Sequence, residues 1–246
     1  MTDTNKSITI EDSDKTAVVG LREAVLAISP LLTTVFDRVD WDAGILLCPY
    51  TKVPEDGDTS HVISGMELVK NSDTTQKLIV KETIEDANPN TKIYSALENI
   101  MVQETAQKIE KSMLGSILAD TTIDPVAGAS ADWTGISSCI THMGTHVFNT
   151  VGSFYAAVSL DDYLVLIQDT DYKRAKENLG NKVIVVVSTS LSAGEMVIMH
   201  EHGVAGSVMV KEMEIDSAPS KDAATLVLPY RTGLKYDVDF VRVVKP

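Results

Sequence analysis

The chain has 246 residues, of which 44% are hydrophobic and 23% charged, enough for a sizeable core in one large or two modest domains. Its 35 acidic residues outnumber its 21 lysines and arginines, and the formal net charge of -14 argues against coating or reading nucleic acid, because such a surface repels a polyanion. Two cysteines are too few for a disulfide framework, and the polar first residues do not have the pattern of a signal peptide. No apolar run approaches the ~18–20 residues that cross a bilayer. We therefore expect a soluble protein made in a reducing cytosol.

The N-terminal residues predict an arm followed by a short helix. Residues 1–15 are mostly polar, a composition typical of a flexible segment. Apolar residues at helical spacing then occupy residues 16–29. Asp14 is a suitable N-cap for this helix, and Pro30 is expected to end it because proline lacks the backbone donor that a helix interior needs.

Residues 44–86 predict an extended β excursion with little core of its own. Turn-forming residues separate runs that are rich in strand-forming side chains. The strand-like runs are residues 44–53, 61–70 and 75–84, and the turns are residues 54–58 and 70–75.

Residues 91–119 predict a long helix. Apolar side chains recur near one face, and charged side chains fill much of the remaining surface. The apolar set is Ile93, Leu97, Ile100, Met101, Ala106, Ile109, Met113 and Ile117. At ~1.5 Å per residue such a helix spans on the order of 40 Å, far more than a typical helix, which suits a structural spine. We expect Glu104 and Glu110 on its solvated face or at contacts between subunits.

The remaining residues alternate between helical and strand patterns, which makes the chain α+β. A small-residue loop at 124–135 precedes two predicted helices, one capped by Ser159 and one closed by Gly180. The helices are residues 159–169 and 171–181, and the strands fall within residues 182–189, 191–203, 204–215 and 225–246.

Four of the five histidines form two pairs with spacings that metal sites use. His142 and His146 stand four apart, but Gly144 between them opposes the continuous helix that would place both rings on one face. His200 and His202 in the sequence MHEHG would share one face of a strand. Because no further ligand motif accompanies either pair, we predict no metal-ligating residue and expect surface or interface histidines. A histidine-based metal-dependent enzyme remains the alternative from a different class.

Other catalytic and cofactor signatures are weak. The sequence contains neither a GxSxG elbow nor a glycine-rich nucleotide loop, and Cys48 and Cys139 have no local partner that would activate a thiol. Asp161 and Asp162 lie where a helix begins, where acids favour the helix dipole. We therefore predict no enzyme, no catalytic or cofactor-binding residue and no cofactor.

The order of these elements resembles the major capsid protein of tailed bacteriophages, which has the Hong Kong 97 fold. The likeness covers residues 30–246 and is most specific over residues 155–206, where Gly180, Val183 and the turn at 192–194 occupy the places of the family pattern. The end of the chain, ATLVLPYRTGLKYDVDFVRVVKP, resembles the closing strand pair of the family.

The resemblance implies a division into the parts of that fold. These are an N-terminal arm and short helix at 1–40, an E-loop at 41–88, a P-domain with the spine helix at 89–125, an A-domain with adjoining P-domain strands at 126–225, and C-terminal strands at 226–246. The excursion would pack on the spine helix of a neighbouring copy through Met66, Leu68, Leu78 and Val80, and the paired histidines would line contacts between subunits.

The implied function is structural. The chain would assemble in the host cytoplasm, as pentamers and hexamers, into the icosahedral capsid of a virion that encloses double-stranded DNA without sequence-specific binding. No membrane partner is implied, whereas a separate scaffolding protein, a portal and decoration proteins are partners that the family uses. An encapsulin nanocompartment shares the fold and is the nearest alternative, since it encloses enzyme cargo instead of DNA.

Overall fold

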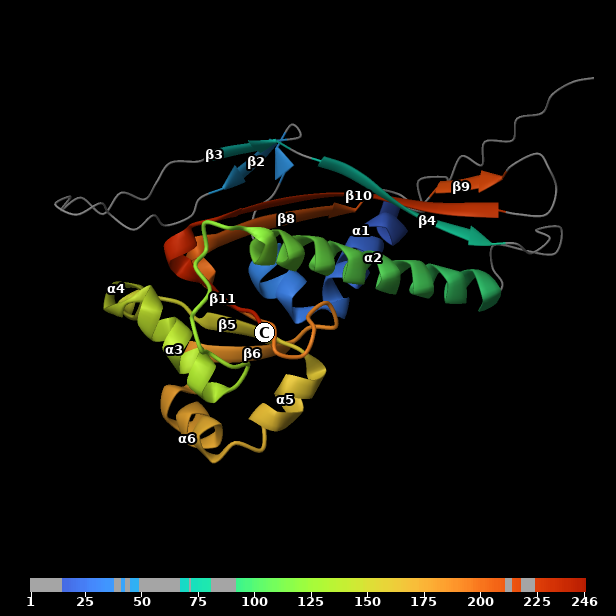
Figure 1. Cartoon of the computed structure of the whole chain (residues 1–246). Helices are drawn as coiled ribbons and strands as arrows, with labels where there is room; N and C mark the ends of the chain where they lie inside the picture. Colours follow the sequence, from blue (N-terminus) through green and yellow to red (C-terminus); the bar gives the residue numbers. More distant parts are fainter. Residues whose placement is uncertain are drawn as a thin grey trace, which may run out of the picture.

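The protein has an α+β fold that contains two antiparallel sheets, a long helix and an α/β unit (Figure 1). The computed structural model describes residues 15–37, 41–42, 45–48, 67–70, 72–80, 92–210, 214–217 and 224–246. The predicted arm at 1–14 and much of the predicted excursion, Met66 included, lie outside these residues, so those expectations are not tested.

The helix predicted at 16–29 is confirmed as α1 (Lys15–Ile28). It ends before Pro30 as expected, and a short π-helical segment, η2 (Leu32–Phe36), follows it. Leu31, Leu32, Val35 and Phe36 are fully buried. The N-terminal segment therefore forms part of the main core, which its strongly apolar sequence favours.

The long helix is also confirmed, as α2 (Lys92–Ala119), and its 28 residues span about 42 Å at the usual rise per residue. Most of the predicted apolar face that the structure describes is buried, including Met101, Ile109 and Ile117. Ile100 is an exception, because 44% of it is exposed. Neither α2 nor any other helix in the described part of the chain combines the length and apolarity needed to cross a membrane.

Two antiparallel sheets lie on the side of α2 that faces away from the α/β unit (Figure 1). The first contains β1 (Trp41–Asp42), β2 (Ile45–Cys48) and β3 (Glu67–Lys70) in that order. The second has the order β4-β10-β8, with β9 also paired to β10. Its strands are β4 (Ser72–Val80), β8 (Val204–Val210), β9 (Glu214–Ser217) and β10 (Ala224–Tyr236).

The expectation of a single excursion at 44–86 needs correction. β2 pairs with β3, but β4 pairs along its whole length with β10, from Ser72 opposite Thr232 to Val80 opposite Ala224. The turn expected at 70–75 is also wrong in part, because β4 already begins at Ser72. Strand pairing depends on partners far away in the sequence, which a local pattern of turn residues cannot specify.

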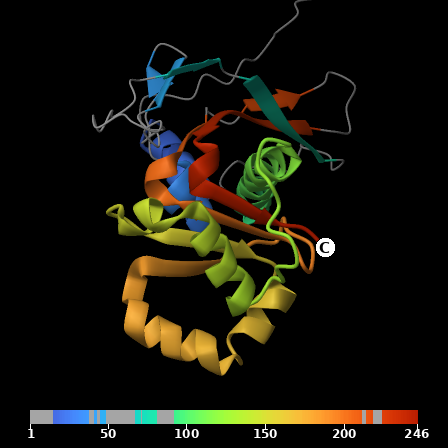
Figure 2. The same ribbon diagram turned by 60° about the vertical axis from the view of Figure 1, so that its left-hand side comes forward.

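The α/β unit is built on a four-stranded sheet with the order β11-β7-β5-β6, in which only β5 and β6 are parallel. Its strands are β5 (Phe154–Val158), β6 (Val183–Val187), β7 (Met196–His200) and β11 (Val241–Val244). Its helices are α3 (Trp133–Met143), α4 (Thr145–Asn149), α5 (Leu160–Leu166) and α6 (Thr170–Leu179), which gather on the side away from α2 (Figure 2). The caps predicted at Ser159 and Gly180 are confirmed.

Both faces of this sheet are buried. Along β5, Tyr155 and Ala157 pack in the main core with α1 and α2, whereas Phe154 and Ala156 pack in a second core with α3. Burial on both faces explains the uninterrupted apolar runs in the sequence. The C-terminal strands predicted as a pair do not pair with each other, because β10 and β11 belong to different sheets.

The outer edge of β8 is closed by the N-terminal segment. Asp37 accepts a hydrogen bond from the Val208 N–H at 3.1 Å, and Arg22 donates to the Val208 carbonyl at 3.0 Å. Arg22 and Asp37 also form an ion pair at 2.6 Å. An unpaired strand edge can form hydrogen bonds with a strand of another molecule. Because Arg22 and Asp37 bond the Val208 backbone groups, they prevent such pairing at this position.

Candidate functional site

The first histidine pair lies on two separate helices. His142 belongs to α3 and His146 to α4, and Gly144, at φ 92°, separates the two helices. Both histidines are exposed, and Nδ1 of His142 lies 2.8 Å from the Ser138 carbonyl. Gly144 interrupts the helix as predicted, but the expectation that this segment forms no stable helix is wrong, because α3 and α4 lie on either side of it. α3 begins at Trp133, inside the loop predicted at 124–135.

The second pair does not have the expected strand geometry. β7 ends at His200, and Glu201–Gly203 forms a 3-10 turn, so the two rings are not presented as alternate residues of one strand. His200 is fully buried, with its ring centroid 4.8 Å from that of Phe154. Nδ1 of His200 accepts a hydrogen bond from the His202 N–H at 3.3 Å. The expectation of a surface or interface side chain is therefore wrong for His200, which packs in a core.

The two pairs do not combine into a metal centre. Among the residues that the structure describes, no group of three or more His, Cys, Asp or Glu side chains could hold a metal ion. His202 lies beside Glu201, with 3.6 Å between Nε2 and the nearer carboxylate oxygen, but this contact supplies two ligands at most. The histidine-based enzyme alternative gains no support from this geometry.

The one cysteine whose side chain is described is placed unfavourably for nucleophilic chemistry. Cys139 is fully buried in α3, and burial raises the pKa of its thiol to about 11, with a smaller opposing effect from Arg242. The thiolate that would act as a nucleophile is therefore scarce at neutral pH.

This burial gives a testable prediction. In a Cys48→Ser background, Cys139 of the folded protein is expected to resist an aromatic disulfide reagent at pH 8, because its thiol is both protonated and inaccessible. The absorbance of the released thiolate is the measurement, and addition of denaturant serves as the positive control. Rapid labelling without denaturant would contradict the burial of Cys139.

A buried carboxylate joins three parts of the fold. Glu110 of α2 is only 5% exposed, and its two oxygens accept hydrogen bonds from the hydroxyls of Ser29 and Ser188. Ser29 lies between α1 and η2, and Ser188 directly follows β6, so this Glu110 junction connects the N-terminal segment, the long helix and the α/β unit. The expectation of a solvated or intersubunit Glu110 is wrong. Glu104, by contrast, is half-buried.

The sequence contains a signal for this junction. Ala106, Glu110, Met113 and Ile117 follow one another at spacings of four, three and four, so they share one helical stripe. Since the other three are buried apolar residues, the glutamate between them is buried as well. A carboxylate held by two serine hydroxyls suits a structural tie better than a catalytic relay, which needs a general base beside the nucleophile.

The outer surface of the α/β unit carries features that the sequence analysis did not single out. Four apolar side chains of α5 and its C-terminal end are exposed, and we call them the α5 stripe: Leu160, Leu164, Val165 and Ile167. A groove of about 640 Å³ also lies between α3 and α6, lined by Trp133, several hydroxyl side chains and Arg174. The run of consecutive apolar residues 164–167 was the available signal, because one short helix cannot bury adjacent residues on a single face.

This architecture is the fold of shell-forming proteins of viruses and virus-like particles, as the comparison with solved structures shows. The resemblance predicted from the order of elements is thus confirmed at the level of the fold. No protein-family model and no curated protein sequence matches the chain.

Three solved structures illustrate the likeness. A virus-like particle protein from Pyrococcus furiosus matches 96% of this chain and 100% of its own, with a TM-score of 0.65 at 14% identity. The capsid protein of a native GTA particle matches 99% of this chain and 94% of its own, with a TM-score of 0.56 at 12% identity. An encapsulin from Synechococcus elongatus matches 88% and 87%, with a TM-score of 0.56 at 11% identity.

Proposed function

We propose that the chain is a major capsid protein that assembles into an icosahedral shell around double-stranded DNA. The observation that carries the proposal is the fold likeness, which extends over nearly the whole of this chain and of its structural neighbours. The net charge of -14 suits a shell that encloses DNA without binding it tightly. The proposal assigns no catalytic role, and the inaccessible Cys139 and the separated histidine pairs are consistent with that.

The proposal includes the division into parts that the family resemblance implies. α2 would be the spine of the P-domain at 89–125. β5, β6 and β7 with α3 to α6 would form most of the A-domain with adjoining P-domain strands at 126–225, and β11 would add a strand to its sheet from the C-terminal segment. The short sheet of β1 to β3 supports the first part of an E-loop at 41–88, whose later part includes β4 and its pairing with β10. The division is completed by the N-terminal arm and short helix at 1–40 and the last strands at 226–246.

Copies of this chain would be the principal partners, arranged as pentamers and hexamers. Some of the neighbouring structures are capsids computed with C5 symmetry, which supports fivefold rings. A scaffolding protein, a portal and decoration proteins are further proposed partners, and each would appear as a co-purifying chain in native particles. Assembly in the host cytoplasm and residence in a virion follow from the same proposal.

Sedimentation velocity of the purified chain tests assembly. We expect particles many times heavier than the 26.6 kDa chain at micromolar concentration, because each interface of ~1,600 Å² suffices for stable association and every copy makes several. A single species of one-chain mass would contradict the proposal.

An encapsulin-type nanocompartment is the second candidate, favoured by the Synechococcus elongatus match. Nuclease-resistant DNA in native particles indicates a capsid, whereas enclosed protein cargo indicates a nanocompartment.

A further inference from the structure

The α5 stripe is an unusual surface for a chain that stays alone. Val165 is 65% exposed and Leu160 is 55% exposed, although burial of either side chain would be favourable. Leu160, Leu164 and Ile167 follow one another at spacings of four and three, so they form a continuous line on one helical face. Contiguous apolar surface of this kind marks an interaction site.

The stripe cannot turn inward, because α5 is held at its first turn. Ser159 donates its hydroxyl hydrogen to Asp162 at 2.6 Å and accepts the Asp162 N–H in return. The same Asp162 carboxylate accepts the Gly194 N–H at 2.9 Å, which ties α5 to the turn before β7. Leu166 faces the second core and is 1% exposed. The outward direction of the stripe is therefore a fixed property of the fold.

A second exposed apolar surface lies at the C-terminal end of α4, and we call Phe148 and Val151 the α4 end. Val151 is 82% exposed, the highest value among the large hydrophobic residues that the structure describes as exposed. Lys182 braces this surface, since its ammonium donates to the Thr150 and Gly152 carbonyls at 2.7 and 2.9 Å and lies 5.6 Å from the Phe148 ring centroid. Lys182 thus fixes the backbone on both sides of Val151 and lies against the Phe148 ring.

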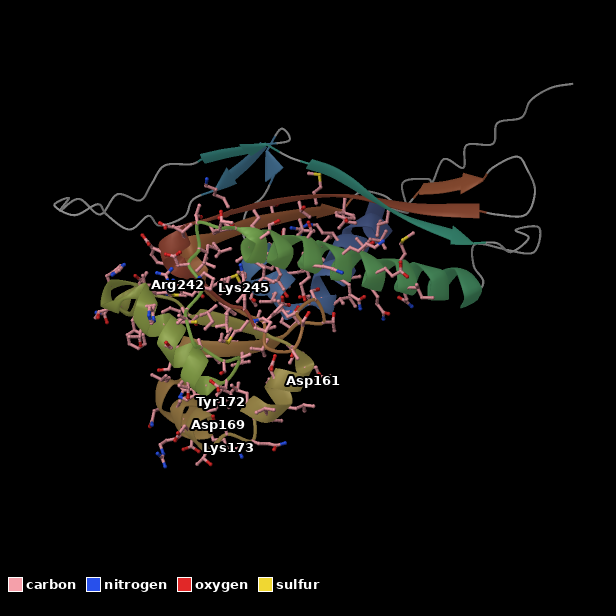
Figure 3. All side chains as sticks on the ribbon, viewed as in Figure 1. Asp161, Asp169, Tyr172, Lys173, Arg242 and Lys245 are labelled. Atoms are coloured by element: carbon pink, nitrogen blue, oxygen red, sulfur yellow. The ribbon has the colours of Figure 1, made fainter. Side chains whose placement is uncertain are left out.

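The two surfaces lie at opposite ends of the α/β unit, as the positions of α4 and α5 show in both views (Figures 1 and 2). Two exposed lysines lie on the side of the unit opposite the stripe. Asp161 lies on α5, beside the stripe, whereas Lys173 lies on α6 at the other side of the unit (Figure 3). Lys176 is exposed three residues further along α6, whereas Arg174 forms an ion pair with Asp171 at 3.7 Å and Glu177 is a further acidic residue of this helix.

We propose that the α5 stripe of one copy packs on the α4 end of the next copy, with Asp161 facing Lys173 and Lys176 of its α6. The contact joins two different surfaces, so it is heterologous, and the proposed pentamers and hexamers require a rotation between copies that closes it into a ring. Stable interfaces bury ~800 Å² per partner, so the stripe and the α4 end form the apolar centre of a larger contact that α6 borders. This inference rests on the proposed function and names the surface that mediates it.

Charge substitutions at the two most exposed positions test this pairing. Val165→Asp alone and Val151→Lys alone are each expected to reduce the assembled fraction at fixed concentration by about tenfold or more, because each places one charge in an apolar contact. The double variant Val165→Asp/Val151→Lys is expected to recover most of the assembly, since the opposite charges then meet between copies. Sedimentation velocity measures the assembled fraction, and circular dichroism with thermal melting verifies that each variant is folded.

A matched control carries the same charge outside the contact. Ser116→Asp, on the exposed face of α2, is expected to leave assembly within about twofold of the unsubstituted chain. The inference is overturned if either single variant assembles normally, or if both fail and the double variant does not recover. Failure of the unsubstituted chain to assemble would instead overturn the proposed function, so the two results are distinguishable.

Discussion

Gly206→Ala is expected to lower the free energy of unfolding by about 3 kcal/mol, whereas the same substitution at Gly115 is expected to raise it slightly. A Cβ atom on Gly206 would lie 2.3 Å from the Phe36 carbonyl oxygen and 2.9 Å from the Phe36 Cα, so the backbone of η2 would have to move away from β8. Strand glycines of this kind mark places where another backbone approaches closely.

Gly115 is the matched control because a side chain there has room. It lies in the interior of α2, and a Cβ atom added to it would meet no heavy atom of another segment within 4 Å. Alanine therefore meets no obstacle at this position and favours the helix by up to about 1 kcal/mol. Urea unfolding followed by circular dichroism measures both variants. Equal stability of the two variants would contradict the close packing of η2 against β8.

Glu110→Ala is expected to destabilise the protein by about 2–4 kcal/mol. The substitution leaves the hydroxyls of Ser29 and Ser188 buried without their acceptor and opens a cavity in the main core. The Glu110 junction connects three parts of the fold, so its loss is expected to loosen the N-terminal segment and the end of β6 together.

Lys111→Ala is the control for this prediction, because Lys111 is adjacent to Glu110 on α2 but exposed. Its effect is expected to stay within about 0.5 kcal/mol. Denaturant unfolding gives the stability of each variant, and hydrogen exchange at Leu32 and Val187 shows whether both attached segments open. A small effect of Glu110→Ala, equal to that of Lys111→Ala, would show that the junction contributes little.

Local patterns in the sequence predicted most helices correctly. α1 and α2 follow from apolar spacing, and α5 and α6 follow from the caps at Ser159 and Gly180. The error at Ile100 arose because the apolar set was assigned too broadly. Ile100 lies on a polar stripe of the helix, because the residues that follow it at successive spacings of four, three and four are Glu104, Gln107 and Lys111.

Features that depend on long-range contacts were not predictable in the same way. The pairing of β4 with β10 joins residues about 150 positions apart, and only the folded chain selects that partner over β3. The buried position of His200 was missed for a related reason. The ring of His200 contacts Phe154 and Phe240, which are distant from it in sequence, whereas the local spacing in MHEHG resembles a ligand motif.

The central claim is that this chain forms closed shells by self-assembly, and imaging of the purified protein tests it most directly. Negative-stain electron microscopy of the chain expressed alone should show round, closed particles of uniform size, and averaged images should show rings of five or six copies. A field of separate single-chain molecules, at concentrations where each interface of ~1,600 Å² would hold, would contradict the claim.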